Sequence, residues 1–302
     1  MNSVRTKAYL ELLLVSVIWG VAGVVIKYTL GGFSPFIFLT YRFFVSTILA
    51  ILLFIITGIK LPKNPKVLAL AVFNGFLIST ASLGLLFLGA NKTTSIDLNL
   101  ISAMAPIMIA AAGIMFLKEH VTGREKIGIA IAFIGTIITI AEPVLKMNDG
   151  AGALEGNIII FASVLVSVAS AVLAKKVMRD EVDALTATNL SFIVGFITII
   201  PFTLPQILAS KFQILTNIPL SYHLGVFYMA ILSGTFAYYL WHKAEKSIEV
   251  SEVNLIAYLY PVFGTPLSVL WLKEKITLPF IIGSVVIALG VFLAEFKKKR
   301  YN

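Results

Sequence analysis

The sequence predicts an all-α polytopic membrane protein with ten transmembrane helices in two inverted five-helix repeats. Hydrophobic residues make up 59% of its 302 residues and charged residues only 13%, a balance far from that of an ordinary soluble domain. A pattern also recurs along the chain: the triplet Asn-Leu-Ile at 99–101 returns at 254–256, and Leu-Lys-Glu at 117–119 returns at 272–274. Each copy lies 155 positions (254 − 99) after its counterpart, which is about half the chain.

Ten apolar segments are long enough to span a bilayer, which takes about 20 mostly apolar residues. Short charged or Pro/Gly-containing turns separate them. They cover residues 8–30, 36–57, 67–90, 96–117, 126–144, 156–174, 185–206, 221–242, 252–272 and 278–296. The first segment is too long for the apolar region of a cleavable signal peptide, so we expect it to remain as a helix. Ten crossings return both termini to the same side.

Positive charge predicts the orientation of this bundle. With the N-terminus inside, 17 Lys and Arg residues face the cytoplasm and five face outward, which also accounts for the net charge of +9 without nucleic-acid binding. We therefore expect both termini on the cytoplasmic side of the cell membrane. The polar stretch 146–155 is the natural junction, which divides the chain into repeats 1–148 and 149–302. Five spans per half give the halves opposite orientations, the arrangement typical of alternating-access transporters.

Small and polar side chains form matching stripes on the fourth and ninth segments. One stripe carries Asn99 and Ser102, and the other carries Asn254 and Tyr258. At helical spacing each stripe can face inward. One interpretation is close helix packing, with each Asn contributing an interhelical hydrogen bond of about 1 kcal/mol. The other is a substrate cavity at the bilayer midplane, because lipid would penalise these polar groups.

Other segments supply further candidates for the cavity lining. These substrate-binding candidates are Trp19, Asn74, Ser79, Ser167 and Tyr238. Tyr228 also lies deep enough to stack on a planar ligand. Tyr239 and Trp241 lie nearer the cytoplasmic end and are interpreted as part of an interfacial aromatic belt. Pro106 and Pro261 loosen the backbone of the striped helices and are predicted hinges.

Two basic residues fall within apolar segments, where insertion of a charge at the bilayer centre costs about 2.5–3.5 kcal/mol. Lys27 and Arg42 both lie within a few turns of the outer end of their helix, so snorkelling to the interface is the favoured interpretation. If they face inward instead, they would attract a carboxylate or phosphate of a substrate. Lys27 has a counterpart in Lys175, which favours a terminal or gating position for it.

Two carboxylates are also related by the 155-residue offset between the repeats. Asp97 opens the fourth segment and Glu252 opens the ninth, where a helix dipole stabilises negative charge, so capping is one interpretation. A pair of gating or proton-linked carboxylates is the other. No acidic residue lies securely at mid-span. Facilitated diffusion or exchange is therefore at least as plausible as proton coupling.

Several chemical signals are missing from the sequence. It has no Cys, and its three His residues lack metal-ligand spacing, so neither a metal nor a cofactor is expected. The P-loop motif of nucleotide-driven proteins is absent as well. The run Asp180-Glu181-x-Asp183 is the nearest approach to the magnesium–diphosphate motif of a membrane-embedded enzyme. Its basic neighbours favour a solvated charge run, and no enzyme is predicted.

A family resemblance follows from these motifs. The run Leu13-x5-Trp19-Gly20 with Lys27, the triplet at 41–43 (Tyr-Arg-Phe) and the duplicated block resemble the EamA branch of the drug/metabolite transporter superfamily. The resemblance implies ten helices in two inverted repeats, with helices 3, 4, 8 and 9 around a central cavity and helices 5 and 10 further out. The sixth segment lacks a Trp-Gly pair, so a ligand is expected to contact the halves unequally.

The leading functional hypothesis is a cytoplasmic-membrane transporter that moves a small organic metabolite by alternating access. Among the family's substrates, an amino acid or related amphipathic compound is favoured, because the inferred lining mixes Asn, Ser and Tyr with small apolar residues. Export is what the resemblance implies. The alternative is a membrane-embedded enzyme or flippase acting on a lipid or lipid-linked substrate. The expected partners are the bilayer and a small molecule, with monomer or homodimer, and proton or exchange coupling, left open.

Overall fold

A computed structural model describes residues 3–58, 61–117, 123–145, 151–177, 182–245 and 258–295. Within these ranges the chain forms helices joined by turns, with no strand. Seven helical segments are long and apolar enough to cross a membrane, and two shorter apolar helices cover residues 126–139 and 278–293. The predicted class, an all-α polytopic membrane protein, is confirmed at this level.

The helices follow the predicted apolar segments. The first part of the chain contains α1 (Ser3–Thr29), α2 (Pro35–Thr57), α3 (Pro65–Gly75), η1 (Phe76–Ser82), α4 (Leu83–Lys92), α5 (Ser95–Ser102), α6 (Ala105–Leu117) and α7 (Gly123–Leu145). The second part contains α8 (Ala151–Val177), α9 (Ala184–Ala209), α10 (Gln213–Thr216), α11 (Leu220–Phe227), η2 (Tyr228–Phe236), α12 (Ala237–Glu245), α14 (Tyr260–Leu272) and α15 (Leu278–Glu295).

Local sequence signals set several helix ends. The first residue of α2 is Pro35, whose missing N–H is not needed in a first helical turn. The same helix ends at Gly58, which has a φ of 64° that glycine adopts without strain. Asp183 precedes α9 and accepts hydrogen bonds from the backbone N–H groups of Leu185 and Thr186. This part of the acidic run is therefore a helix cap.

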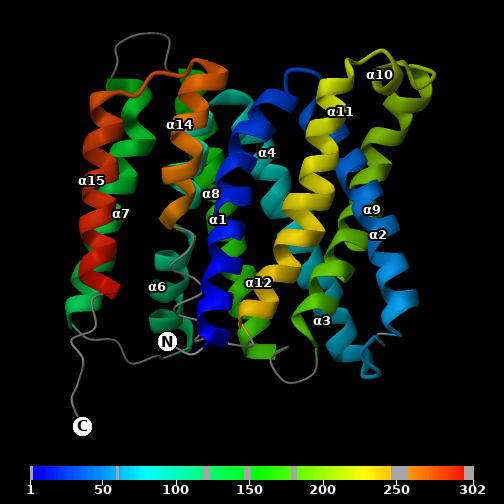
Figure 1. Cartoon of the computed structure of the whole chain (residues 1–302), viewed down its shortest axis with the longest axis horizontal. Coiled ribbons are helices and arrows are strands. Elements are labelled where there is room, and N and C mark those ends of the chain that lie inside the picture. Colours follow the sequence, from blue (N-terminus) through cyan, green and yellow to red (C-terminus); the bar gives the residue numbers. More distant parts are fainter. Residues whose placement is uncertain are drawn as a thin grey trace.

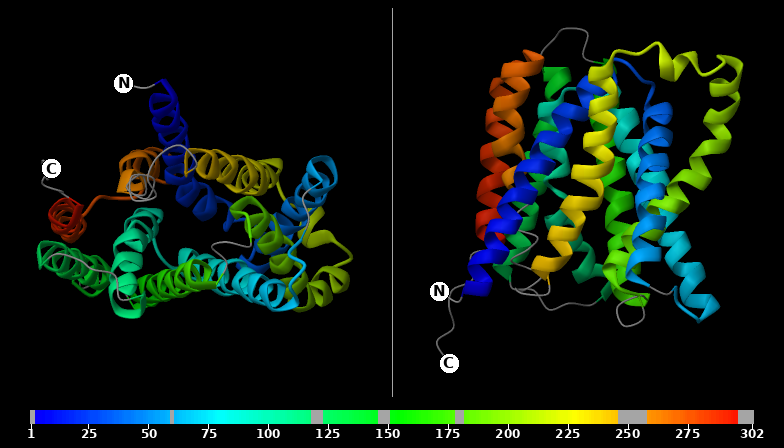
Figure 2. Two further views of the ribbon diagram at one scale, coloured as in Figure 1. Left: turned by 90° about the horizontal axis from the view of Figure 1, so that it is seen from below. Right: turned by 45° about the vertical axis from the view of Figure 1, so that its right-hand side comes forward.

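The helices form two facing rows. Viewed from below, α15, α14, α1 and α12 lie in one row and α7, α6, α8 and α3 in the other (Figure 2). The pair α7 and α15 closes one end of the molecule, and α2 packs against α9 at the opposite end (Figure 1). The first helix begins and the last helix ends on the same side of the bundle (Figure 1).

Small residues let α7 and α15 approach closely. A Cβ atom added to Gly135 would lie 2.8 Å from the backbone nitrogen of Ile287 and 2.9 Å from the carbonyl oxygen of Gly283. One added to Gly290 would lie 2.6 Å from the carbonyl oxygen of Gly128. Such small-residue interfaces are how membrane helices maximise van der Waals contact without a hydrophobic driving force.

Large apolar side chains cover the outside of the bundle. Ile55, Ile56 and Phe202 are 73%, 79% and 74% exposed. Water would penalise so much exposed apolar surface, whereas lipid chains solvate it without cost. Inside, Phe38, Phe43 and Phe87 form part of a fully buried cluster. The surface is therefore that of a protein immersed in a bilayer, with a packed core beneath it.

Two π-helical segments interrupt the bundle near its middle. Helix α3 continues through η1 into α4, and α11 continues through η2 into α12. π-Helical turns are rare, leave backbone carbonyls imperfectly paired and occur often at functional sites. A third break separates α5 from α6 at Ala103 and Met104. These irregularities lie on the helices that surround the site described next, and the apolar pattern of the sequence does not reveal the π-helical ones.

Candidate functional site

A cavity of about 400 Å³ lies between the two rows of helices. We call it the main cavity. A smaller hollow of about 270 Å³, the side cavity, lies next to it. The residues that line both are Trp19, Arg42, Leu83, Ser102, Tyr238 and Tyr260. The main cavity lies within the range of small-molecule binding sites, and side chains from both halves of the chain enclose it.

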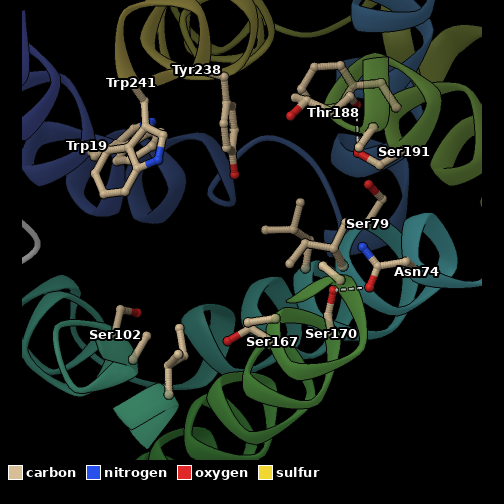
Figure 3. Close-up of a pocket in the computed structure, with 18 of the residues that line it drawn as sticks. Trp19, Asn74, Ser79, Ser102, Ser167, Ser170, Thr188, Ser191, Tyr238 and Trp241 are labelled. Atoms are coloured by element: carbon tan, nitrogen blue, oxygen red, sulfur yellow. Dashed lines mark hydrogen bonds between the residues drawn. The ribbon is translucent and has the colours of Figure 1, made fainter. Parts of the chain in front are cut away.

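Four aromatic residues form one wall of the main cavity. We call Trp19, Tyr238, Trp241 and Tyr260 the aromatic wall. The ring centroid of Trp19 lies 5.0 Å from Tyr238, 5.1 Å from Trp241 and 6.0 Å from Tyr260. Edge and tilted ring pairs of this kind are favourable. Figure 3 shows Trp19 and Trp241 side by side, with Tyr238 reaching toward the open centre. The wall offers aromatic ring faces and edges to an apolar or cationic group.

Hydrogen bonds fix this wall to the helices behind it. The indole nitrogen of Trp19 donates to the carbonyl oxygen of Ser233 at 2.9 Å, within the π-helical segment η2. From the same segment, the Tyr228 hydroxyl donates to the carbonyl oxygen of Ile18 at 2.7 Å. These bonds join α1 to η2 in both directions. Tyr228 thus holds the scaffold and is not among the lining residues, which corrects its predicted role as a stacking platform.

Small polar residues form the opposite wall. The polar wall consists of Asn74, Ser79, Ser167, Ser170, Thr188 and Ser191. The Ser170 hydroxyl donates to the Asn74 side-chain oxygen at 2.7 Å, and Ser191 and Ser167 each donate to a backbone carbonyl one turn earlier. These hydroxyl oxygens keep acceptor capacity for a ligand. In Figure 3 the labelled members of this wall face the aromatic wall across the opening.

Arg42 is buried between the two cavities. It is 4% exposed, lines both hollows, and its Nε and Nη1 atoms have no hydrogen-bond partner among the residues that the structure describes. The snorkelling interpretation is therefore wrong for this residue, and the inward-facing alternative holds. Its guanidinium carbon lies 5.7 Å from the ring centroid of Phe43 and 5.9 Å from that of Phe87. These rings hold the cation away from lipid.

Most of the predicted lining residues do converge. Those that line the main cavity are Trp19, Asn74, Ser79, Ser102, Ser167 and Tyr238. Pro106, predicted as a hinge, lines it as well. Sequence reasoning missed Thr188, Ser191 and Tyr260, and it placed Trp241 in an interfacial belt. Trp241 lines the cavity instead, whereas its neighbour Tyr239 is 49% exposed and faces outward. The helical spacing of Tyr238 and Trp241, three residues apart on one face, was the signal that could have found it.

Asn99 combines the two roles considered for it. Its side-chain nitrogen donates to the carbonyl oxygen of Gly20 at 3.2 Å, and its amide fills the space left by Gly23 and Gly264. It also lines the side cavity. Its main contacts are therefore interhelical, between α5, α1 and α14. Its counterpart Asn254 lies outside the described residues.

The remaining predicted positions have different outcomes. Tyr258 is not a lining residue, although Tyr260, two positions later, lines both hollows. Glu252 lies outside the described residues. Pro106 and Pro261 both fall in the first turn of a helix, α6 and α14 respectively. There proline costs no hydrogen bond, so any bending near Pro106 would occur at the turn at 103–104 that precedes α6.

Asp97 and Lys27 lie in a polar layer at the end of the bundle where α4 meets α5. Asp97 is 4% exposed and accepts hydrogen bonds from Thr93 at 3.1 Å and from Asn157 at 3.4 Å. Lys27 donates to the carbonyl oxygens of Ala90 and Asn91 at 3.0 and 3.3 Å. A cation at this position caps the C-terminal end of α4. Neither residue lines the cavities.

Glu274 closes the same layer from the other half of the chain. Its carboxylate accepts hydrogen bonds from the backbone N–H groups of Ser95 and Ile96 at 2.8 and 3.1 Å, and from the Ser95 hydroxyl at 2.9 Å. The Ser268 hydroxyl oxygen lies 2.7 Å from that of Ser95. A carboxylate at the N-terminus of α5 is stabilised by its free N–H groups and its dipole. The Leu-Lys-Glu block at 272–274 thus ties α14 to α5.

The fold and the cavity define a class of protein: a multi-pass membrane protein with an internal cavity sized for a small molecule. The sequence model of the EamA-like transporter family matches residues 6–141 and again residues 154–296. The chain therefore belongs to the EamA-like transporter family, and the resemblance read from its motifs is confirmed. Members of this family are transporters rather than enzymes.

Individual relatives match along nearly the whole chain. The uncharacterized transporter YyaM of Bacillus subtilis (strain 168) is 27% identical over 97% of this chain and 96% of its own. An uncharacterized transporter of Archaeoglobus fulgidus is 28% identical, covering 97% of this chain and 100% of its own. A protein of Escherichia coli (strain K12) named "Probable amino-acid metabolite efflux pump" is 26% identical over 94% of this chain and 93% of its own.

A solved crystal structure has a similar fold. It superposes with a TM-score of 0.61 and 17% sequence identity, and the match covers 97% of both chains. At that identity the likeness supports the fold alone. The membership in a transporter family rests on the sequence matches, and the site rests on the geometry of this chain.

Proposed function

We propose that this chain is a cytoplasmic-membrane carrier that moves a small organic metabolite by alternating access at the main cavity. It would contain ten transmembrane helices in two inverted five-helix repeats, 1–148 and 149–302, with both termini in the cytoplasm. The observation that carries this proposal is the main cavity, about 400 Å³ in volume, which side chains from both halves line. A site at the interface of two repeats is where such carriers bind their substrates.

Three observations support the inverted repeats. The family model matches twice along the chain. The glycines that correspond under the 155-residue offset pack reciprocally, Gly135 against Gly283 and Gly290 against Gly128. The π-helical segments also correspond, because η1 shifted by the same offset covers residues 231–237 and overlaps η2. Two copies of one unit facing each other would produce these reciprocal contacts.

The contacts around Glu274 support the alternating mechanism. They join α14 of the second half to the first turn of α5 in the first half. In the proposed orientation this layer lies on the extracellular side. A carrier must close one side of its site while the other opens. We therefore infer that this layer is the closed outer gate, and that Lys27 and Asp97 support it from neighbouring helix ends.

Amino acids or related amphipathic metabolites are the substrates that we favour. The main cavity places apolar aromatic surface opposite hydroxyl and amide groups, which suits a molecule with one apolar and one polar end. Relatives from Escherichia coli and Salmonella typhimurium carry the name "Probable amino-acid metabolite efflux pump" at 26% identity. Export is the direction that this name suggests for the present chain.

A lipid substrate has a weaker basis. A third hollow of about 390 Å³ lies between α6 and α8, where a lipid chain could lie. Its lining consists only of Met108, Ala111, Ala112, Met115, Phe116, Leu165, Val168, Ala169 and Val172. A flippase must also bind a polar head group, and none of the described residues that line this hollow is polar. The polar groups lie in the main cavity instead.

Counterflow in proteoliposomes tests the carrier proposal. Vesicles are loaded with a pool of amino acids, nucleosides and polyamines, and mass spectrometry identifies what leaves only when the protein is present. The variant Ser167→Trp, which fills the main cavity, should abolish the efflux. Ile158→Trp is the matched control, because Ile158 is 52% exposed on the same helix and a large side chain fits there. Efflux that survives Ser167→Trp in folded protein, or its absence from wild-type vesicles with and without a proton gradient, contradicts the proposal.

A further inference from the structure

We propose that Arg42 is the anion-binding residue of this site and that the transported metabolite carries a carboxylate, which Arg42 binds in the main cavity. This inference rests on the proposed function, since it names the class of molecule that the carrier moves. It is carried by the surroundings of one side chain: its burial, its free hydrogen-bond donors and the charges around it.

Arg42 is held in place without using its Nε and Nη1 donors. Its guanidinium packs on the rings of Phe43 and Phe87, and aromatic faces attract a cation without accepting its N–H groups in plane. The Nε and Nη1 donors are buried and have no partner in the described part of the chain. A buried donor that lacks an acceptor is costly, so a site with this geometry is prepared for an acceptor from outside the chain.

The charge of Arg42 is also uncompensated among the described residues. No carboxylate in that part of the chain lies within ion-pair distance of it: the described ion pairs there are Lys92 with Glu155 and Lys243 with Glu11. No described acidic residue lines either cavity. In a site shielded from water, an opposite charge on a ligand is attracted more strongly than it would be at the surface.

Ser79 supplies a second group for the same anion. Its side-chain oxygen is buried and unpartnered, the residue is 1% exposed, and it lines the main cavity with Arg42. Its hydroxyl is one donor, and the guanidinium edge presents donors in a fork that matches two carboxylate oxygens. Two kinds of donor that lack acceptors therefore border one hollow.

The remainder of the lining narrows the ligand class. Arg42 is the one positively charged side chain among the described residues of the cavity walls, so it matches a single negative charge. A phosphate monoester would carry close to two negative charges, and one of them would have no positive side chain to pair with. The aromatic wall can hold an apolar group, or an ammonium group by cation–π contact. The ligand class is thus a monocarboxylate with an apolar or ammonium-bearing remainder, and amino acids belong to it.

Tryptophan fluorescence gives a direct binding test. Two of the three tryptophans, Trp19 and Trp241, line the main cavity, so their emission should report an occupant. The purified protein is titrated with three matched sets built on leucine, phenylalanine and methionine. Each set contains the amino acid, its amide, its decarboxylated amine and its desamino acid. Inorganic phosphate is titrated separately, which distinguishes a carboxylate site from a phosphate site.

The expected result is binding of carboxylates but not of the matched amide or amine. Arg42→Gln should weaken that binding roughly 10- to 100-fold, the effect of losing charge-assisted hydrogen bonds. Arg42→Lys should recover it in part, because the charge remains without the fork. The control Arg124→Gln removes an exposed arginine at the start of α7 and should bind as wild type does.

Ser79→Ala is a second test that does not depend on tolerance of an Arg42 replacement. It is nearly isosteric, and it should weaken carboxylate binding several-fold while leaving thermal unfolding unchanged. Equal binding of acid and amide, binding of phosphate but no carboxylate, or carboxylate binding unaffected by Arg42→Gln would each overturn the inference. Binding of no probe by wild-type protein overturns it too. Carboxylate binding without counterflow supports the Arg42 site while counting against the carrier proposal.

Discussion

Among single residues, the pair formed by Lys243 and Glu11 shows how one side-chain contact links distant helices. The Lys243 amine donates to the Glu11 carboxylate, joining α12 to the first turns of α1. Ala8, Leu12 and Ala244 are buried beside it. The start of α1 and helix α12 lie at the end of the bundle opposite the C-terminal end of α14 (Figure 1). The contact ties the two halves together where a second gate would have to open.

The Lys243 contact predicts a pH dependence of stability. The hydrogen bond to Glu11 raises the pKa of the Lys243 amine above its ordinary value of 10.5. A lysine with a raised folded-state pKa contributes stability that is complete below the unfolded value and is lost as pH rises through the folded one. We expect Glu11→Gln to lower the unfolding temperature by a constant amount below about pH 10. The difference should shrink above pH 10.5.

Thermal unfolding in detergent between pH 7 and 11 measures this difference. Lys243→Met should show the same profile as Glu11→Gln, and the double variant should be no less stable than either single variant. A difference that grows with rising pH would contradict the assignment. Because Lys243 is partly exposed, high salt should reduce the effect as well.

At the scale of helices, the contact between α7 and α15 depends on residues without side chains. Gly135→Ala would place a methyl group against the backbone of Ile287 and Gly283, which cannot move as a side chain could. We expect a loss of stability of about 1–3 kcal/mol, as for other overpacked sites. Gly123→Ala on the same helix meets no atom within 4 Å and should be neutral. Unfolding of both variants in denaturant measures the difference, and equal stability would refute this account of the interface.

The hydrogen bonds of Glu274 predict that replacing this residue changes access to the cavity. Glu274→Ala removes the acceptor for two N–H groups of α5, and loss of about 1 kcal/mol shifts a two-state opening roughly fivefold. The chain has no cysteine, so Ser102→Cys provides a unique thiol in the cavity wall. Its modification by an impermeant reagent added on the Glu274 side should be about fivefold faster. Lys275→Ala, an exposed neighbour, is the control, and unchanged rates would show that Glu274 is no gate.

At the scale of the whole molecule, the predicted orientation can be tested with single cysteines. Lys63 and Asn217 are exposed on opposite sides of the proposed membrane. In intact cells an impermeant thiol reagent should label Asn217→Cys and leave Lys63→Cys unlabelled until the cells are permeabilised. The excess of positive charge on the Lys63 side is the physical reason. Labelling in the opposite order would place both termini outside.

The sequence predicted much of the cavity because helical periodicity assigns residues to faces. Ser102 and Pro106 lie one turn apart and both line the main cavity, as their stripe indicated. Periodicity does not say which neighbour a face meets. Asn99 shares that stripe but packs against Gly20 and Gly23, because the helix is interrupted after Ser102 and the preceding helix, α5, turns toward α1.

The sequence by itself determined the all-helical membrane class, the transporter family and half of the polar wall, since these follow from composition, apolar length and motifs spaced along one chain. Only the tertiary structure decided that Arg42 faces inward, that Trp241 joins Trp19 in the aromatic wall and that Glu274 caps α5. Each of these facts depends on helices separated by many residues. Contacts of that kind arise from packing, which fixes the partner of a side chain and gives a buried charge its role.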